Sequence, residues 1–124
     1  MTAVMITVND LTLAAELNNS PTAQQILSQL PIDFSGALWG DEIYGSIPVS
    51  AAAEEDASED VEVGTLAYWP VGSAFCLFYG PTPASTGDQP RAASPVNIVG
   101  RVSGDATVLR QISSSPQVRI EKAA

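Results

Sequence analysis

The sequence of 124 residues predicts a mainly β protein, a closed eight-stranded antiparallel barrel capped by two short helices, as a single domain over residues 1–124. Three observations favour this fold class. Short apolar or alternating runs recur along the chain, separated by Gly, Pro, Asn and Asp, as is typical of antiparallel strands. Two segments carry helix signals instead. Many short strands would leave unpaired edges, so we expect the sheet to close on itself.

Two strands are predicted at the start of the chain, over residues 3–8 and 11–17, where apolar residues alternate with others. Asn9 and Asp10 lie between them. Both residue types tolerate the left-handed backbone of a tight hairpin turn. The first two strands are therefore expected to form a hairpin.

The clearest helix signal follows this hairpin. Ser20 suits the N-cap and Pro21 suits the first helical position. Apolar residues then recur at i, i+3, i+4 and i+7 from Ala23 to Leu30, which places one apolar stripe against a core. Pro31 is expected to end the helix.

Two further strands are predicted over residues 32–38 and 42–49, with Gly40 and Asp41 in the turn between them. Side chains alternate along a strand, so Glu42 and Tyr44 should share one face. Pro48 suggests an edge position or a bulge near the end of the second strand.

The acidic stretch at residues 51–60 predicts a solvated loop that charge repulsion keeps extended. The alternative is a functional role for these carboxylates, as ligands of a divalent metal ion. Their spacing does not match a calcium-binding loop, and the glycine that such a loop needs is missing. We therefore assign no metal site.

A central hairpin is predicted within residues 64–83, which hold most of the aromatic residues and the only cysteine. Its strands are residues 66–69 and 74–79, and residues 70–72 supply the turn. Residues 82–94 are rich in proline, serine and small residues, so we expect a long loop there. Loops of this length are often binding segments.

The last third of the chain predicts a strand, a short helix and a strand. Residues 96–102 alternate, and Asp105 can cap a helix whose apolar side includes Leu109. Residues 117–122 form the last predicted strand. With these two, the predicted strands number eight.

Composition excludes several function classes. Fourteen acidic against five basic residues give a net charge of −9, which disfavours a nucleic-acid partner. Without histidine and with one cysteine, the chain has no Ser-His or Cys-His nucleophile pair and no disulfide framework. We find no metal, nucleotide or flavin motif and expect no cofactor. No apolar run approaches the roughly 20 residues of a membrane span, and the start of the chain lacks a basic signal region, so we expect no membrane partner and a cytoplasmic protein.

Several segments resemble cyclophilins. The run of residues 72–77 is similar to a cyclophilin strand with the pattern Gly-Ser-Gln-Phe-Phe-Ile, and residues 98–102 are similar to a strand with the pattern Phe-Gly-Lys-Val. More closely, the chain resembles short, stand-alone prokaryotic cyclophilin-like proteins of unassigned function. The segments that carry this closer resemblance are residues 39–44, 68–70, 75–83, 94–97 and 99–100.

The resemblance implies a cyclophilin-like barrel, but the chain departs from the active isomerases. Those enzymes use an arginine on an early strand, and usually a glutamine and a histidine, around an aromatic pocket for proline. Here no arginine precedes Arg91, Ala74 replaces the glutamine and Cys76 replaces a pocket phenylalanine. Losing a preorganised donor such as that arginine commonly lowers the rate by a factor of about 10² to 10³. We therefore assign no catalytic residue.

The candidate ligand-binding residues combine apolar surfaces with polar tips, which is the composition of a cleft. Glu42 is the strongest single candidate for a ligand-binding residue, because a carboxyl group among aromatic side chains needs a partner if it is buried. Cys76 is either a small buried hydrophobe or part of the pocket lining. The full set is Trp39, Glu42, Tyr44, Tyr68, Trp69, Cys76, Thr82 and Asn97.

Three functions fit these observations. The first is a binding module that holds a peptide or small molecule in an aromatic and acidic groove without efficient catalysis. The second is a divergent peptidyl-prolyl cis-trans isomerase in which another donor replaces the arginine. The third is an interaction subunit of a larger enzyme assembly, or a homodimer, since cyclophilin-like domains also occur in amidohydrolase and carboxylase assemblies.

Overall fold

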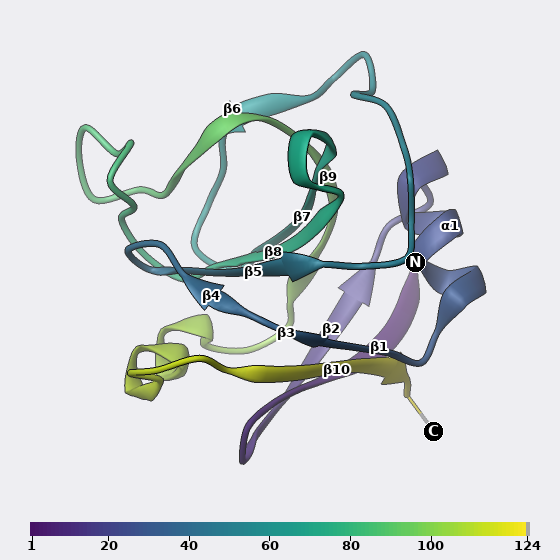
Figure 1. The fold of residues 1–124 in the computed structure, drawn as a ribbon, viewed down its shortest axis with the longest axis horizontal. Helices are drawn as coiled ribbons and strands as arrows, with labels where there is room; N and C mark the ends of the chain where they lie inside the picture. The colour runs from purple at the N-terminus through teal and green to yellow at the C-terminus, as the bar shows by residue number, and fades with distance from the viewer. Residues whose placement is uncertain (124) are drawn as a thin grey trace.

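The computed structural model describes residues 1–123 and shows a mainly β fold with few helices. Figure 1 shows the strands rolled around a common interior, with α1 packed at one end. The helical elements are α1 (Pro21–Gln29) and two 3₁₀ helices, η1 (Pro70–Gly72) and η2 (Ala106–Gln111). The strands are β1 (Thr2–Val8), β2 (Leu11–Leu17), β3 (Ile32–Ser35), β4 (Ala37–Leu38), β5 (Glu42–Ser46), β6 (Ser58–Asp60), β7 (Thr65–Trp69), β8 (Ala74–Phe78), β9 (Arg91–Val102) and β10 (Gln117–Lys122).

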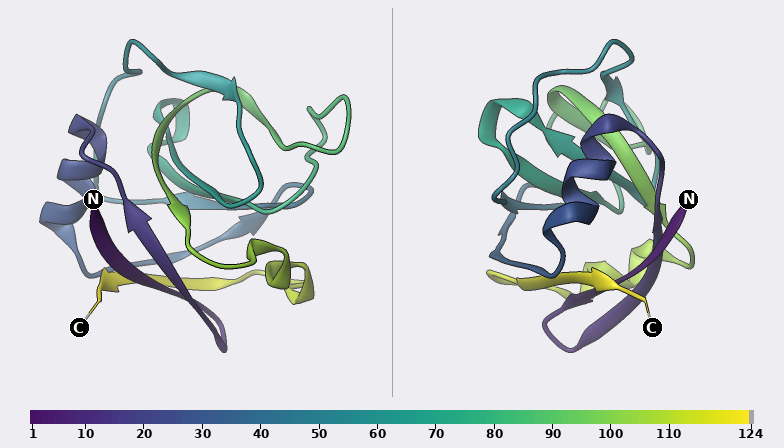
Figure 2. Two further views of the ribbon diagram at one scale, coloured as in Figure 1. Left: turned by 180° about the vertical axis from the view of Figure 1, so that it is seen from behind. Right: turned by 90° about the vertical axis from the view of Figure 1, so that its right-hand side faces the viewer.

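All of these strands belong to one ten-stranded sheet of antiparallel pairs. Its order is β3-β10-β1-β2-β9-β7-β8-β5-β4, and β6 pairs with β9 beside this path. The two end strands, β3 and β4, are neighbours in the chain, so the sheet curls until its ends meet at Gly36 (Figures 1 and 2). No hydrogen-bonded ladder joins β3 to β4 among residues 1–123.

The prediction of a closed eight-stranded barrel is therefore wrong in strand number and in closure. The expected strand over residues 32–38 is divided at Gly36, whose N–H leaves the ladder and donates to the carbonyl of Pro116 at 2.8 Å. The acidic stretch supplies the other extra strand, because β6 pairs Asp60 with Arg91. Their side chains also form an ion pair of 2.6 Å, so part of this stretch is ordered by charge pairing.

The first hairpin and the first helix are confirmed. β1 pairs with β2 along its whole length, and Asn9 adopts the left-handed conformation that the turn requires, with φ of 51°. Ser20 caps α1 by accepting a hydrogen bond from the N–H of Ala23 at 3.3 Å. The apolar stripe of α1 then buries Ala23 and Ile26 in the core.

Two boundaries and the type of the second helix differ from the expectation. β5 ends at Ser46, two residues before Pro48, which cannot donate to a ladder. β9 starts at Arg91, so the predicted loop over residues 82–94 is shorter than expected. The second helix is a 3₁₀ helix, capped as predicted by Asp105, which accepts a hydrogen bond from the N–H of Thr107 at 3.0 Å.

The middle of the sheet is apolar on both faces. Every residue of β8 is buried, and β7 is buried except for Trp69 at its end. One face, with Leu66 and Phe75, belongs to the main core. Every strand except β4 and β6 contributes buried residues to this core, as do α1 and η2, and Leu38 of β4 packs against it. The other face belongs to a second, smaller cluster. Its members are Val61, Ala67, Cys76, Phe78, Ala92 and Val96, with Tyr44 and Trp69 packed against it.

The side chain of Asn97 connects three parts of the fold. It is fully buried on β9, and its Nδ2 donates to Thr22 Oγ1 in α1 and to the carbonyl of Ala52, both at 3.0 Å. Its Oδ1 accepts from the N–H of Glu54 at 2.8 Å, and the Glu54 carboxylate in turn accepts from the N–H and hydroxyl of Thr22. This network fixes the acidic loop to the N-terminus of α1, where the helix dipole favours a negative charge.

We expect Asn97→Ala to lower the free energy of unfolding by about 2–4 kcal/mol, because it leaves several buried polar groups without partners. Urea denaturation followed by circular dichroism measures this change. The exposed Gln24→Ala in α1 is the control and should shift stability by no more than about 0.5 kcal/mol. Equal effects of the two substitutions would contradict the structural role of Asn97.

Candidate functional site

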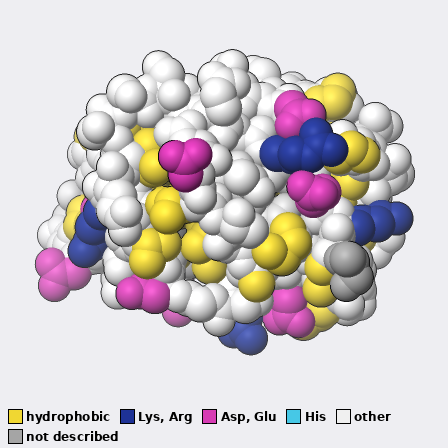
Figure 3. Space-filling view, turned by 90° about the horizontal axis from the view of Figure 1, so that it is seen from below, with side chains coloured by type: hydrophobic (Ala, Val, Ile, Leu, Met, Phe, Trp, Pro, Cys, Tyr) yellow, Lys and Arg dark blue, Asp and Glu magenta, His cyan; other side chains and the backbone are white. Residues whose placement is uncertain are grey.

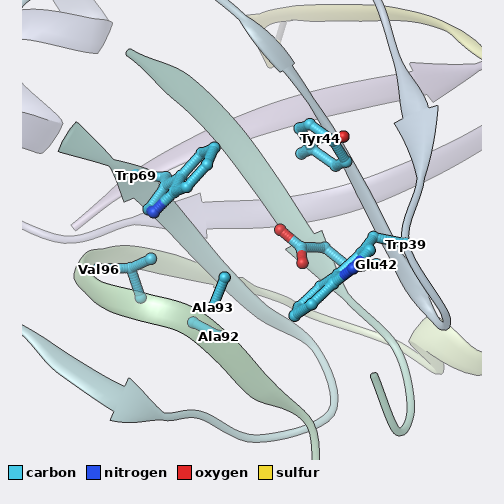
Figure 4. Close-up of a pocket in the computed structure, with 7 residues that line it drawn as sticks. All are labelled: Trp39, Glu42, Tyr44, Trp69, Ala92, Ala93 and Val96. Atoms are coloured by element: carbon cyan, nitrogen blue, oxygen red, sulfur yellow. The ribbon is translucent and has the colours of Figure 1, made fainter. Parts of the chain in front are cut away.

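A pocket of about 170 Å³ opens over the second apolar cluster. Its walls come from four parts of the chain: the turn between β4 and β5, the strand β5, the end of β7 and the first half of β9. Figure 4 shows the carboxyl group of Glu42 pointing into the space between the two indole rings. The lining residues are Trp39, Glu42, Tyr44, Trp69, Ala92, Ala93 and Val96.

Trp39 is held at the pocket by a tight turn. Its N–H donates to the carbonyl of Glu42 at 2.9 Å, and Gly40 after it has a positive φ of 59°, which favours glycine. A Cβ at Gly40 would lie 2.8 Å from the Cα of Thr82 and 2.9 Å from the Cδ of Pro83. The turn is therefore packed directly on the loop that follows β8, and this contact fixes the position of the indole.

Trp69 and Tyr44 form the opposite wall. Their rings meet edge to face, with centroids 6.4 Å apart and an interplanar angle of 84°. Trp69 Nε1 donates to Ser94 Oγ at 2.6 Å, so the polar tip of this indole is satisfied by β9. A Cβ at Gly72 would lie 2.8 Å from the Trp69 ring, which means that the turn after β7 packs against the other side of the indole.

Glu42 is the unusual residue of the site, because its side chain is buried while its carboxyl group faces an apolar pocket. The residue is 6% exposed. Burial raises the pKa of Glu42 from 4.5 to about 7, although a hydrogen bond with the Cys76 thiol acts in the opposite direction. Within residues 1–123, no lysine or arginine forms an ion pair with Glu42. At neutral pH this carboxyl group is therefore present in both protonation states.

Two arginines, Arg91 and Arg110, form ion pairs with carboxylates other than that of Glu42. Arg91 pairs with Glu59 at 3.4 Å and with Asp60 at 2.6 Å, on the strand β6. Arg110 pairs with Asp41 at 3.2 Å. Asp41, which precedes Glu42 in the chain, thus has a basic partner, whereas Glu42 has none in the described residues.

Cys76 lies beneath the pocket and does not line it. It is buried in the second cluster, directly across the ladder from Tyr44, and its Sγ lies 3.9 Å from the carbonyl of Ala74. Burial raises the pKa of the Cys76 thiol well above its usual range, and the nearby Glu42 raises it further. The thiol therefore stays protonated and acts as a small apolar group with a weak donor.

Three of the predicted site residues lie away from this pocket. Tyr68 is fully buried in the main core, where its hydroxyl donates to the carbonyl of Val49 at 2.7 Å. Successive strand residues face opposite sides, so Tyr68 cannot share the pocket with its neighbour Trp69. Asn97 forms the network with α1 described above. Thr82 is a loop residue whose hydroxyl donates to the carbonyl of Arg91.

Sequence reasoning missed the wall formed by β9. Ala92, Ala93 and Val96 are small and apolar and carry no chemistry that would attract attention. The surrounding serines and prolines favour a loop, yet this segment is an extended part of β9 that pairs with β6. The only signal was the direct continuation of the segment into the alternating run from Val96.

Clusters of metal ligands and basic surface patches are two other features that indicate function. Among residues 1–123, no group of three or more His, Cys, Asp or Glu side chains could hold a metal ion. On the face in Figure 3, acidic and basic side chains lie side by side and form no basic stripe. Over the same described residues, no helix is long and apolar enough to cross a membrane.

We expect Glu42→Gln to stabilise the protein at alkaline pH but not at acidic pH. The folded pKa of about 7 lies above the unfolded value of 4.5, so the contribution of the protonated group is fully present below pH 4.5 and is lost as the pH rises through 7. The free energy of unfolding that the wild type loses in this way amounts to roughly 3 kcal/mol once the pH is well above 7. Urea denaturation at about pH 5 and pH 8.5 measures it, with the exposed Glu55→Gln as control. A benefit of Glu42→Gln that does not change with pH would contradict this account of the site.

Comparison with known proteins finds a matching family and similar structures. A family model described as Cyclophilin-like matches residues 2–121. The solution structure of the hypothetical protein AF2241 from Archaeoglobus fulgidus is similar, with a TM-score of 0.82 and 35% identity over 98% of this chain and 95% of that chain. The structure of McbB in complex with tryptophan has a TM-score of 0.72 and 18% identity, over 98% of this chain and 45% of that one, which shows a shared fold. None of the curated proteins matches the chain. The resemblance seen in the sequence is confirmed, and the chain belongs to the cyclophilin-like family.

Proposed function

We propose that this chain is a cyclophilin-like binding module whose aromatic pocket holds a peptide or small molecule without efficient catalysis. One observation carries the proposal: the pocket is formed by rigid elements, and a single buried carboxyl group is aimed into it. Concave, mostly apolar pockets with a few convergent polar groups are the usual form of small-ligand sites.

The polar groups around the pocket support binding rather than turnover. Glu42 is the only titratable lining residue apart from Tyr44, and no arginine lines the pocket. The electrostatic donor that the resemblance to active isomerases calls for is therefore missing from the described lining. A carboxyl group without a second acid or base orients a ligand better than it transfers protons between two positions.

A neighbouring hollow gives room for a ligand larger than the pocket. This second hollow, of about 270 Å³, shares Tyr44 and Trp69 with the first. Glycine and small residues line much of the remainder, so backbone groups are accessible to an extended ligand. Its other lining residues are Ser35, Gly36, Ala37, Gly45, Ser46, Gly72 and Ala74.

A nuclear magnetic resonance titration tests this proposal with two probes, an Ala-Pro peptide and free tryptophan. Tryptophan is included because McbB, which has the same fold, was solved with it. We expect at least one probe to shift the indole resonances of Trp39 and Trp69 in a saturable way, while the cis-trans exchange rate of the peptide stays unchanged. Faster exchange at catalytic protein concentrations would instead establish a divergent isomerase.

Trp39→Ala provides the matched variant. The turn that carries Trp39 is partly exposed, so we expect the variant to fold, and truncating an aromatic anchor should weaken binding about tenfold or more. Val71→Ala, at an exposed position outside the pocket, is the control and should bind like the wild type. Equal binding by both variants would place the ligand elsewhere. Association with a partner subunit or a second copy stays a prediction.

A further inference from the structure

We propose that the pocket selects an organic cation, an alkylammonium or methylated ammonium group, with Glu42 as its counter-ion and Trp39, Tyr44 and Trp69 as its walls. This inference rests on the proposed function, because it names the class of ligand for the same pocket. The chemistry is shared by free amines and by the side chain of lysine in a peptide. The experiment below separates these sources.

The arrangement of the aromatic rings is the first argument. Three aromatic side chains from separate parts of the chain converge on one small cavity. Two of them, Tyr44 and Trp69, stand nearly perpendicular, at 84°, so they form a corner rather than a flat slot. Ring faces carry negative potential and attract cations within about 6 Å, and cages of this composition are the usual recognition site for quaternary ammonium groups. A corner fits a compact, rounded cation better than a flat aromatic ring.

The unpaired carboxyl group is the second argument, and it is independent of the first. Glu42 is 94% buried, given its 6% exposure, and its oxygens point into the cavity between the two indoles. A buried carboxylate needs either a proton or a cationic partner. None of the protein's ion pairs described for residues 1–123 includes it. A cation from outside would supply the partner that the protein does not.

The groups around Glu42 include no cationic partner for its carboxylate. Its titratable neighbours are the Cys76 thiol on β8, the Tyr44 hydroxyl on β5, the Tyr79 hydroxyl and the Asp41 carboxylate, and none of them is basic. Arg110 is also close to Tyr79 but is paired with Asp41. The net charge of −9 further raises the local concentration of cations around the whole molecule.

Other classes of ligand fit less well. An anion would meet the Glu42 carboxylate and the negative faces of the rings. A neutral apolar ligand would fill the cavity but would leave the carboxyl group enclosed without a cationic partner, so this group would have to be protonated. Only a cation uses the rings and the carboxyl group together.

The experiment compares probes of equal shape that differ in charge. Choline is titrated against its neutral isostere 3,3-dimethyl-1-butanol by nuclear magnetic resonance, and n-butylammonium is titrated against n-butanol. We expect each cation to bind about tenfold or more tightly than its neutral partner at about pH 8.5. A peptide with trimethyllysine, compared with choline, then shows whether the group is read free or on a peptide.

The pH dependence and one variant test the role of Glu42. Choline keeps its charge at every pH, so a fall in its affinity of about tenfold or more between about pH 8.5 and 5.5 reports protonation of the protein. Glu42→Gln should remove both this fall and the preference for the cation, while 3,3-dimethyl-1-butanol still binds. Retention of the neutral probe shows that the variant pocket is folded.

The outcomes separate the two proposals. If 3,3-dimethyl-1-butanol and n-butanol bind as tightly as their cationic partners, the pocket is a binding site but the cation inference is overturned. If neither these four probes nor the peptide and tryptophan bind, the proposed function itself fails, and the cation inference fails with it.

Discussion

The structure depends on burying both faces of the strands β7 and β8. One face turns into the main core with Leu66 and Phe75, and the sheet that curls around this core covers it. The other face, with Ala67 and Phe78, points away from that interior and needs a cover of its own. The long strand β9 supplies most of this cover, because its first half runs past β7, pairs with β6 and folds over the second face (Figure 1). The pocket is the part of the second face that this cover leaves open.

This origin explains the chemistry of the pocket. Its floor is apolar because it is the second cluster. Its rim is aromatic because Trp39 in the turn after β4, Tyr44 on β5 and Trp69 at the end of β7 meet there. Glu42 occupies a strand position that faces this cluster, so its carboxyl group is desolvated by the same packing that forms the pocket. A pocket that holds a buried carboxyl group with a raised pKa thus follows from an incompletely covered apolar face.

Much of the fold could be predicted from local patterns, and the failures have physical causes. The N-cap of α1, the hairpin turn at Asn9 and the shared face of Glu42 and Tyr44 follow from residue chemistry and strand alternation. The same alternation places Tyr68 and Trp69 on opposite faces of β7. Grouping both in one candidate site, because they are adjacent aromatic residues in the sequence, ignores this constraint. β6 and the first half of β9 could not be predicted, because tertiary pairing and an ion pair stabilise segments whose own residues favour loops. The role of Asn97 depends on three partners that are distant in the sequence.

The most direct test of the central claim is the pKa of Glu42, measured from the chemical shift of its side-chain carboxyl carbon, with and without choline. The structure predicts a pKa of about 7 in the free protein, well above the usual 4.5. It also predicts that a bound cation lowers this pKa, because the positive charge stabilises the carboxylate. An ordinary pKa that choline does not change would contradict a buried, unpaired carboxyl group in a cation-binding pocket.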